Sequence, residues 1–245
     1  MKTKERRHLK ENELVHTLTA AQAFIEARRR QIGAGVVVAL ILGGTLAGIF
    51  ILRQRNQAQG TGLLADAMVV LDAPVQPPTT PIPEEGKPTP PSTQQPGTYP
   101  TEQAKLEAAI PKLKAAADAY PASEAGITAR YHLAGALADL GRHKEALEAY
   151  DDVIARAGSG LYGRMAKLGK AEVHVQLSEY EPAIAIYKEL AEANDTNLPV
   201  DAILMQLART YQAAGNSGEA QKAFSRIVHE HPGSPFSAEA GKQVQ

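Results

Sequence analysis

Histidines and paired carboxylates are the residues of this sequence that could bind a metal ion or carry out acid–base chemistry. The seven histidines are scattered, and His229 with His231 lacks a further pair of ligands at a recognised metal-binding spacing. Acidic pairs such as Asp151–Asp152 are typical of a solvated surface. The chain has no cysteine, which excludes disulfides, zinc–thiolate sites and a cysteine nucleophile. Because phosphate-binding glycine loops and the G-x-S-x-G and H-E-x-x-H motifs are also absent, we expect no enzymatic activity, metal or cofactor.

The elements that carry these residues are expected to be helical. Alanine is abundant, while the 245 residues include no tryptophan and only eight tyrosines and four phenylalanines. The net charge of −1 conceals an asymmetry, since residues 1–31 carry eight Lys and Arg against four acids and residues 53–245 carry 18 against 23. The larger part is therefore acidic and lacks a basic stripe, which argues against a nucleic-acid partner.

Residues 32–52 form an uncharged, mostly apolar run of 21 residues. As a helix this run would span about 30 Å, the thickness of a bilayer core, so we predict a transmembrane helix. Arg53 and Arg55 follow without a small-residue cleavage pattern, which favours an uncleaved anchor over a signal peptide. The basic residues before the span predict a cytoplasmic N-terminus. The predicted location is the bacterial inner membrane, with one span and a periplasmic C-terminal domain.

Small residues recur along the predicted span at spacings that gather them on one side of a helix. They are Gly35, Ala39, Gly43, Gly44, Ala47 and Gly48. Such a face lets a second helix approach closely in lipid, so it predicts packing against another inner-membrane protein or a second copy of the chain. The alternative is the ordinary abundance of Gly and Ala in membrane spans.

An amphipathic helix is predicted before the span, within the cytoplasmic residues 1–31. Its apolar positions follow helical spacing at Leu14, Leu18, Ala21 and Ile25. This helix either docks a cytoplasmic partner or lies on the lipid headgroups with its basic residues toward anionic lipid.

A second short helix and a proline-rich linker follow the span. The juxtamembrane residues 53–71 contain an apolar stripe of Leu63, Leu64, Ala67, Met68 and Leu71. Ten of the sixteen prolines fall within residues 72–100, which predicts a solvated linker. Two arrangements are open: either the helix is free and the linker is a spacer, or residues 61–71 pack on the following domain and the linker loops out between them.

Residues 101–245 contain a repeat with a step of 37 residues. Small residues keep this step at Ala109, Ala146, Ala183 and Ala220, and aromatic residues keep it at Tyr150, Tyr187 and Phe224. A period in this range predicts an α-solenoid of stacked hairpins, each with a first helix (helix A) and a second helix (helix B). About three to four hairpins fit the domain, and residues 61–71 could supply a missing first helix A.

These repeated residues resemble tetratricopeptide repeats. The best unit matches the family's pattern of small, large and turn residues at Ala208, Tyr211, Gly215, Ala220, Phe224 and Pro232. An earlier unit matches at Ala134, Leu137, Gly141, Ala146 and Tyr150. The unit between them departs from the pattern, because Lys170 and His174 occupy usually apolar positions and Ser178 replaces the turn glycine. The resemblance implies an all-α fold whose helix A face binds proteins.

The resemblance places seven residues on a protein-binding groove: Tyr131, Met165, Leu168, Val175, Met205, Arg209 and Gln212. Tyr, Leu and Met side chains suit extended or helical apolar segments of a partner. The alternative is that some of them pack against neighbouring helices. Charged chaperone tails are not the expected ligand, because Tyr131 and Gly135 stand where repeats that clamp such tails carry Lys and Asn.

The layout of a basic N-terminus, one span and exported repeats is similar to that of the ancillary subunit of the Sec translocon. This similarity implies a periplasmic scaffold that binds proteins and hands emerging polypeptides to chaperones. The proline-rich insertion departs from the compact form of that family. The alternative function is a structural coordinator that links the inner membrane to envelope, cell-division or cell-wall machinery.

Overall fold

The computed structural model describes residues 29–79, 93–193 and 198–244. The amphipathic positions predicted at Leu14, Leu18, Ala21 and Ile25 lie outside the described residues. The chain divides into two compact units, residues 1–55 and residues 56–245.

Helix α2, Arg29–Leu71, begins in the first unit and ends in the second. Its large apolar side chains between Val38 and Leu52 are at least half exposed, with Leu40 at 70% and Phe50 at 68%. Over the residues that the structure describes, no helix combines the length and apolar character that a membrane crossing requires. The span predicted over residues 32–52 includes side chains outside the described ones, and it stays a prediction.

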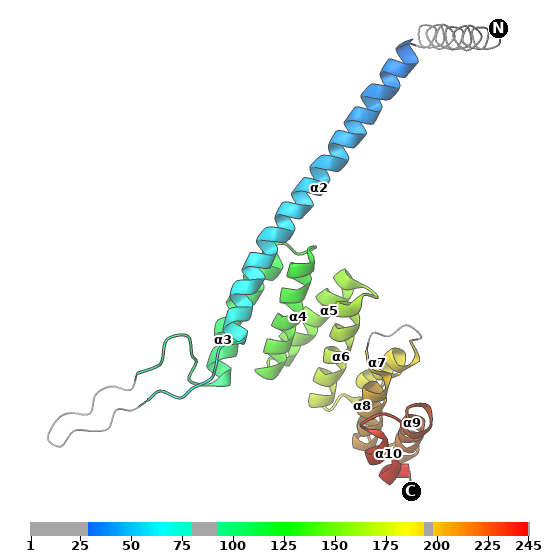
Figure 1. Ribbon diagram of the computed structural model, residues 1–245. Helices are drawn as coiled ribbons and strands as arrows, with labels where there is room; N and C mark the ends of the chain where they lie inside the picture. Colours follow the sequence, from blue (N-terminus) through cyan, green and yellow to red (C-terminus); the bar gives the residue numbers. More distant parts are fainter. Residues whose placement is uncertain (1–28, 80–92, 194–197, 245) are drawn as a thin grey trace, which may run out of the picture. The chain divides into compact units, whose positions relative to one another are not determined.

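The second unit is built of consecutive helices that pack each against the next (Figure 1). After the end of α2 they are α3 (Glu102–Ala119), α4 (Glu124–Asp139), α5 (His143–Ala157), α6 (Leu161–Gln176), α7 (Tyr180–Glu192), α8 (Val200–Ala213), α9 (Ser217–Glu230) and α10 (Ser237–Val244). In this order α4, α6 and α8 are helices A, and α5, α7 and α9 are helices B. The predicted all-α solenoid of helical hairpins is confirmed.

The residues that repeat every 37 positions form the core of this unit. Alanines at the helix crossings, such as Ala134, Ala171 and Ala208, are completely buried, which lets the backbones of neighbouring helices approach closely. The repeated aromatic side chains of helices B are buried, with Tyr150 5%, Tyr187 1% and Phe224 2% exposed. Small residues therefore set the spacing between helices, and aromatic rings fill the volume that remains.

The end of α2 packs against α3 inside the second unit. Ala67 and Val70 share one apolar cluster with Leu106, Ala109 and Leu113 of α3. The Tyr120 hydroxyl, just after α3, donates a hydrogen bond to Gln59 of α2. Residues 56–71 and α3 are thus an antiparallel pair that precedes α4, in the order of a helix A and a helix B.

The proline-rich segment leaves α2 and returns to α3 with its two ends side by side. The backbone N–H of Gln76 donates to the Tyr99 carbonyl oxygen at 2.8 Å, and the Tyr99 N–H donates to the Pro74 carbonyl oxygen at 3.1 Å. Thr79 and Thr93 exchange two further backbone hydrogen bonds. Tyr99 also packs against the α2–α3 cluster. The segment therefore begins and ends at one place on the second unit.

The turn between helix A and helix B uses a left-handed residue in every hairpin from α4 to α9. Gly141 and Gly215 have φ values of 72° and 80°, and Ser178 has a φ of 59° at the equivalent position. In each turn the next N–H donates to a carbonyl in the last turn of helix A, as Glu179 does to His174 at 2.8 Å. Ser178 therefore adopts the same left-handed turn geometry, although glycine adopts it more easily.

Substitutions at two of these turns test the free-energy cost of a serine in the left-handed region. We expect Ser178→Gly to raise the free energy of unfolding by about 0.5–1 kcal/mol, because relief of left-handed strain exceeds the entropic cost of glycine. The matched change Gly215→Ser should lower it by about 1 kcal/mol. Urea unfolding of the full chain in a non-ionic detergent, followed by circular dichroism, measures both. Shifts of the same sign for the two variants would contradict this account of the turn.

Candidate protein-binding groove

Helices A carry the residues predicted to bind a partner, and the 37-residue step relates their positions. One row contains Thr128, Met165 and Ala202, a second contains Tyr131, Leu168 and Met205, and a third contains Gly135, Glu172 and Arg209. Within α4 these rows lie three or four residues apart, which places them on one side of the helix. Because α4 and α6 also contact each other directly, their rows form one surface, which we call the helix A face.

A cavity of about 340 Å³ opens at the N-terminal end of this face. It is lined by residues from three successive helices A: Gln57, Thr61 and Leu64 of α2, Glu124, Ala125 and Thr128 of α4, and Tyr162 of α6. A volume near 300 Å³ lies at the small end of the range for ligand sites. The cavity can therefore take one or two side chains of a bound protein segment.

Three tyrosines continue the surface from this cavity. The ring of Tyr131 lies 5.8 Å from that of Tyr162 and 6.2 Å from that of Tyr150, measured between ring centroids. His132 stacks edge-on against Tyr131 at 5.5 Å. Aromatic rings at these separations hold one another in place, and they offer apolar faces with polar rims.

Tyr150 reaches the helix A layer because Gly169 leaves room for it. A Cβ atom at Gly169 would lie 2.5 Å from the Tyr150 hydroxyl oxygen, whereas one at Gly135 would lie 3.8 Å from it, an ordinary contact distance. The side chain starts on α5 and ends between α4 and α6. Gly169 therefore determines where the Tyr150 ring lies behind the groove.

Glu172 of α6 belongs to the third row of the helix A face. Desolvation raises the pKa of its carboxyl group, and the nearby charge of Asp139 raises it further. Burial also raises the pKa of Tyr131, Tyr150 and Tyr187, with a smaller contribution from the Glu172 charge in each case. The tyrosines consequently stay protonated at neutral pH, and the partly buried Tyr131 presents a hydroxyl donor on the groove.

The two lysines of α6 form ion pairs with acidic residues of the neighbouring helices. Lys167 pairs with Glu189 of α7, and Lys170 pairs with Asp151 of α5 at 2.5 Å. These pairs explain why lysine is tolerated at a usually apolar position of this hairpin. Among the described residues, neither Glu172 nor Asp139 has an ion-pair partner.

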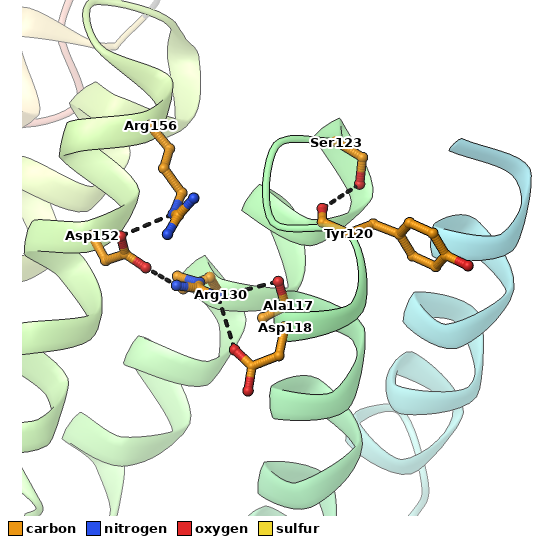
Figure 2. Close-up of polar contacts among 7 residues, drawn as sticks. All are labelled: Ala117, Asp118, Tyr120, Ser123, Arg130, Asp152 and Arg156. Atoms are coloured by element: carbon orange, nitrogen blue, oxygen red, sulfur yellow. Dashed lines mark hydrogen bonds and ion pairs between the residues drawn. The ribbon is translucent and has the colours of Figure 1, made fainter. Parts of the chain in front are cut away.

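A separate polar cluster centres on Arg130 of α4 (Figure 2). Its guanidinium donates to the Ala117 carbonyl oxygen at 3.1 Å and to Asp118 at 3.0 Å, and it pairs with Asp152, which also binds Arg156. The Arg130–Asp152 pair recurs 37 residues later as Lys167–Glu189. We interpret this repeated pair as a link between helix A and helix B of one hairpin.

The predicted groove residues have different surroundings in the structure. Tyr131 and Met165 are partly buried, and Leu168 and Val175 pack along the edge of the C-terminal core cluster. Met205 does not line an open groove, because only 1% of it is exposed. α8 is buried on several sides, and Ile203, Leu204 and Leu207 belong to the same core cluster.

The last helix accounts for the two remaining groove residues. Arg209 pairs with Glu239 of α10 at 2.8 Å, and Gln212 donates to Gln243 of α10 at 3.0 Å. α10 therefore lies along α8, and Ala240 completes the core there. The accessible part of the helix A face runs from α2 to α6.

Three residues of this surface were not predicted from the sequence, although the repeat step contained the signal for two of them. Thr128 precedes Met165 by 37 residues, and Glu172 precedes Arg209 by the same step. Tyr162 lies outside the rows, in the first turn of α6, and its place at the cavity depends on the tertiary structure.

The small residues predicted to pack in a membrane belong to the first unit. A Cβ atom at Gly43, Gly44 or Gly48 would meet no atom within 4 Å, and Ala47 is exposed. The side chain of Ala39 and the position of Gly35 lie outside the side chains that the structure describes. A packing role for these residues stays a prediction.

Comparisons with known proteins find tetratricopeptide repeats in two parts of the chain. Two sequence models described as tetratricopeptide repeat match residues 102–161 and residues 202–234. No curated protein sequence matches the chain. Similar solved structures include TPR-like repeats from Podosopora anserina, at 17% identity and a TM-score of 0.49, covering 57% of this chain and 76% of that one. A tetratricopeptide repeat protein from Parabacteroides merdae has 20% identity and a TM-score of 0.48, covering 58% and 54%.

The raised pKa of Glu172 predicts a pH-dependent stability. A carboxyl group with a higher pKa in the folded state binds more protons there than in the unfolded state, so stability falls as the pH rises past 4.5. Glu172→Gln should therefore raise the melting temperature slightly at pH 7.5, because Glu172 is exposed and solvent screens its charge, and this gain should shrink toward pH 4. Thermal unfolding at both pH values measures the effect. The exposed Glu148→Gln on α5 is the control, with a change within about 0.5 kcal/mol. An equal gain for Glu172→Gln at both pH values would contradict the assignment.

Proposed function

We propose that this tetratricopeptide repeat protein is a membrane-anchored scaffold, and that it binds other proteins through the helix A face. The observation that carries the proposal is the cavity beside Tyr162, which continues into the tyrosine cluster. Tetratricopeptide repeats bind proteins or peptides, and this face presents side chains suited to an extended segment. The raised pKa values of Tyr131 and Tyr150 favour neutral phenols that donate hydrogen bonds over phenolates that act as nucleophiles.

The proposed anchor is the uncharged run of residues 32–52. Its support is the length of the run, together with the large side chains between Val38 and Leu52 that helix α2 leaves exposed. An apolar surface of this extent is unfavourable in water and favourable in lipid. The excess of basic residues before the run favours a cytoplasmic N-terminus, so the repeats would lie in the bacterial periplasm.

The proposed role of the scaffold is to assist the Sec translocon by receiving exported polypeptides and passing them to periplasmic chaperones. The support for this step is the similarity of layout to the ancillary translocon subunit. A coordinator of envelope, cell-division or cell-wall machinery would use the same anchor and the same groove. The identity of the bound proteins separates these two roles.

The absence of cysteine allows a direct test of the anchor and its orientation. Single cysteines are introduced as Thr3→Cys before the run and as Ser159→Cys at an exposed loop between α5 and α6. In intact bacterial cells with a permeabilised outer membrane, a membrane-impermeant maleimide should label Ser159→Cys and leave Thr3→Cys unlabelled until the cells are lysed. Labelling of Thr3→Cys alone would reverse the orientation. If neither cysteine is labelled before lysis, the exported location is wrong.

Photocrosslinking from the groove tests the scaffold. A benzoylphenylalanine placed at Thr128 or Met165 should form adducts in living cells, while one at the exposed position Gln221 of α9 should not. Translocon subunits and nascent exported chains among the adducts support the proposed role. Adducts confined to division or cell-wall proteins support the coordinator instead. Equal adducts from all three positions would contradict a binding role for the groove.

A further inference from the structure

On the accessible part of the helix A face, from α2 to α6, three carboxylates have no ion-pair partner among the described residues. Asp139 ends α4, and Glu172 lies on the neighbouring α6, where the charge of Asp139 acts on its carboxyl group. The lysines of α6 are committed to Glu189 and Asp151. Glu124 adds a third carboxylate at the cavity. Residues 53–245 are also acidic as a whole, with 18 Lys and Arg against 23 Asp and Glu. A bound cation would therefore complement this groove, whereas an anionic segment would be repelled.

The acidic and aromatic residues of α4 lie on one continuous stripe. Glu124, Thr128, Tyr131, Gly135 and Asp139 follow one another at steps of three or four residues, which keeps them on one side of the helix. At 1.5 Å per residue the stripe is about 22 Å long. An extended chain rises about 3.3 Å per residue, so roughly seven residues of a partner would cover it.

Gly135 leaves space for a guest side chain beside this stripe. Apart from the backbone of α4 itself, the described atom within 4 Å of a Cβ atom built there would be the Tyr150 hydroxyl oxygen, at 3.8 Å. Glu172 occupies the equivalent position of the next helix A, 37 residues later. A side chain over Gly135 would thus lie next to the ring of Tyr131 and within reach of the carboxylates of α4 and α6. Lys and Arg combine the cation and the apolar stem that such surroundings favour.

We propose that the groove binds an extended protein segment that carries a lysine or arginine. The basic side chain lies beside Tyr131 over Gly135, with its cation between Asp139 and Glu172. An apolar neighbour of this residue fills the cavity beside Tyr162 and Thr128. This inference rests on the proposed function and adds the chemistry of the partner to it.

Three labelled peptides of equal length test the inference. Fluorescein-labelled Ser-Leu-Lys-Leu-Lys-Leu-Ser is titrated with the full chain in a non-ionic detergent, and binding is followed by anisotropy. Matched peptides carry Gln or Glu in place of both lysines. We expect the Gln peptide to bind at least tenfold more weakly than the Lys peptide, and the Glu peptide not to bind. The affinity for the Lys peptide should also fall as the salt concentration rises.

Variants of the chain separate charge recognition from groove binding. Glu172→Gln and Asp139→Asn should each weaken binding of the Lys peptide about five- to tenfold and leave the Gln peptide unchanged. Glu148→Gln, on the outer helix α5, is the matched control and should change neither affinity. Circular dichroism of Glu172→Gln should match that of the wild-type chain, so that a loss of binding is not due to unfolding. Thr128→Trp, which fills the cavity, should weaken the Lys and Gln peptides alike.

The outcomes distinguish failure of the inference from failure of the proposed function. Equal binding of the Lys and Gln peptides, with no effect of Glu172→Gln, would overturn the basic partner and leave the groove as a binding site. Binding that Thr128→Trp does not change would place the peptide elsewhere and overturn the inference. If the wild-type chain binds none of the peptides, the inference also fails, and the crosslinks from Thr128 and Met165 then decide whether the groove binds proteins at all.

Discussion

The close approach of neighbouring helices is the constraint on which the repeat domain depends. Where α4 begins, a Cβ atom at Gly126 would lie 2.1 Å from the Tyr120 carbonyl oxygen, and at the start of α6 one at Gly163 would lie 2.0 Å from the Gly158 carbonyl oxygen. Completely buried alanines act in the same way at the helix crossings. The smallest residues set the distance between neighbouring helices. The large rings of Tyr150, Tyr187 and Phe224 then fill the remaining volume in one arrangement, and their packing fixes the orientation of each hairpin relative to the next.

The same packing links the core to the binding surface. Tyr150 belongs to the core of a hairpin, yet its hydroxyl ends between the two helices that form the groove, because Gly169 lacks a side chain there. The exposed carboxyl group of Glu172 lies near this ring, and partial desolvation together with the charge of Asp139 raises its pKa. We interpret this carboxylate as part of the surface that recognises a partner.

Repeated residues made much of this architecture predictable. The step of 37 located the buried alanines and aromatics, and the turn residues located the ends of helices A, including Ser178. The groove was harder to predict, because the repeat period shows on which side of a helix a residue lies, but it does not show which other helices cover that side. Met205 has the correct register but is enclosed by the core around α8, whereas Tyr162 lies off the register and reaches the cavity. The ion pair Arg130–Asp152 and its equivalent Lys167–Glu189 depend on contacts between helices, which single positions do not reveal.

Because the two ends of the proline-rich segment are paired with each other, the geometry of the repeat domain does not depend on the length of that segment. Because Gln76 bonds to Tyr99 and Thr79 to Thr93, residues between 79 and 93 can be added or removed without moving α2 relative to α3. Closing a longer loop is inexpensive, since each doubling of its length costs only about 0.6 kcal/mol. Homologous chains are thus free to differ in this insert while sharing the solenoid. The insert is also the natural position at which to introduce a reporter domain or a protease site without disturbing the repeats.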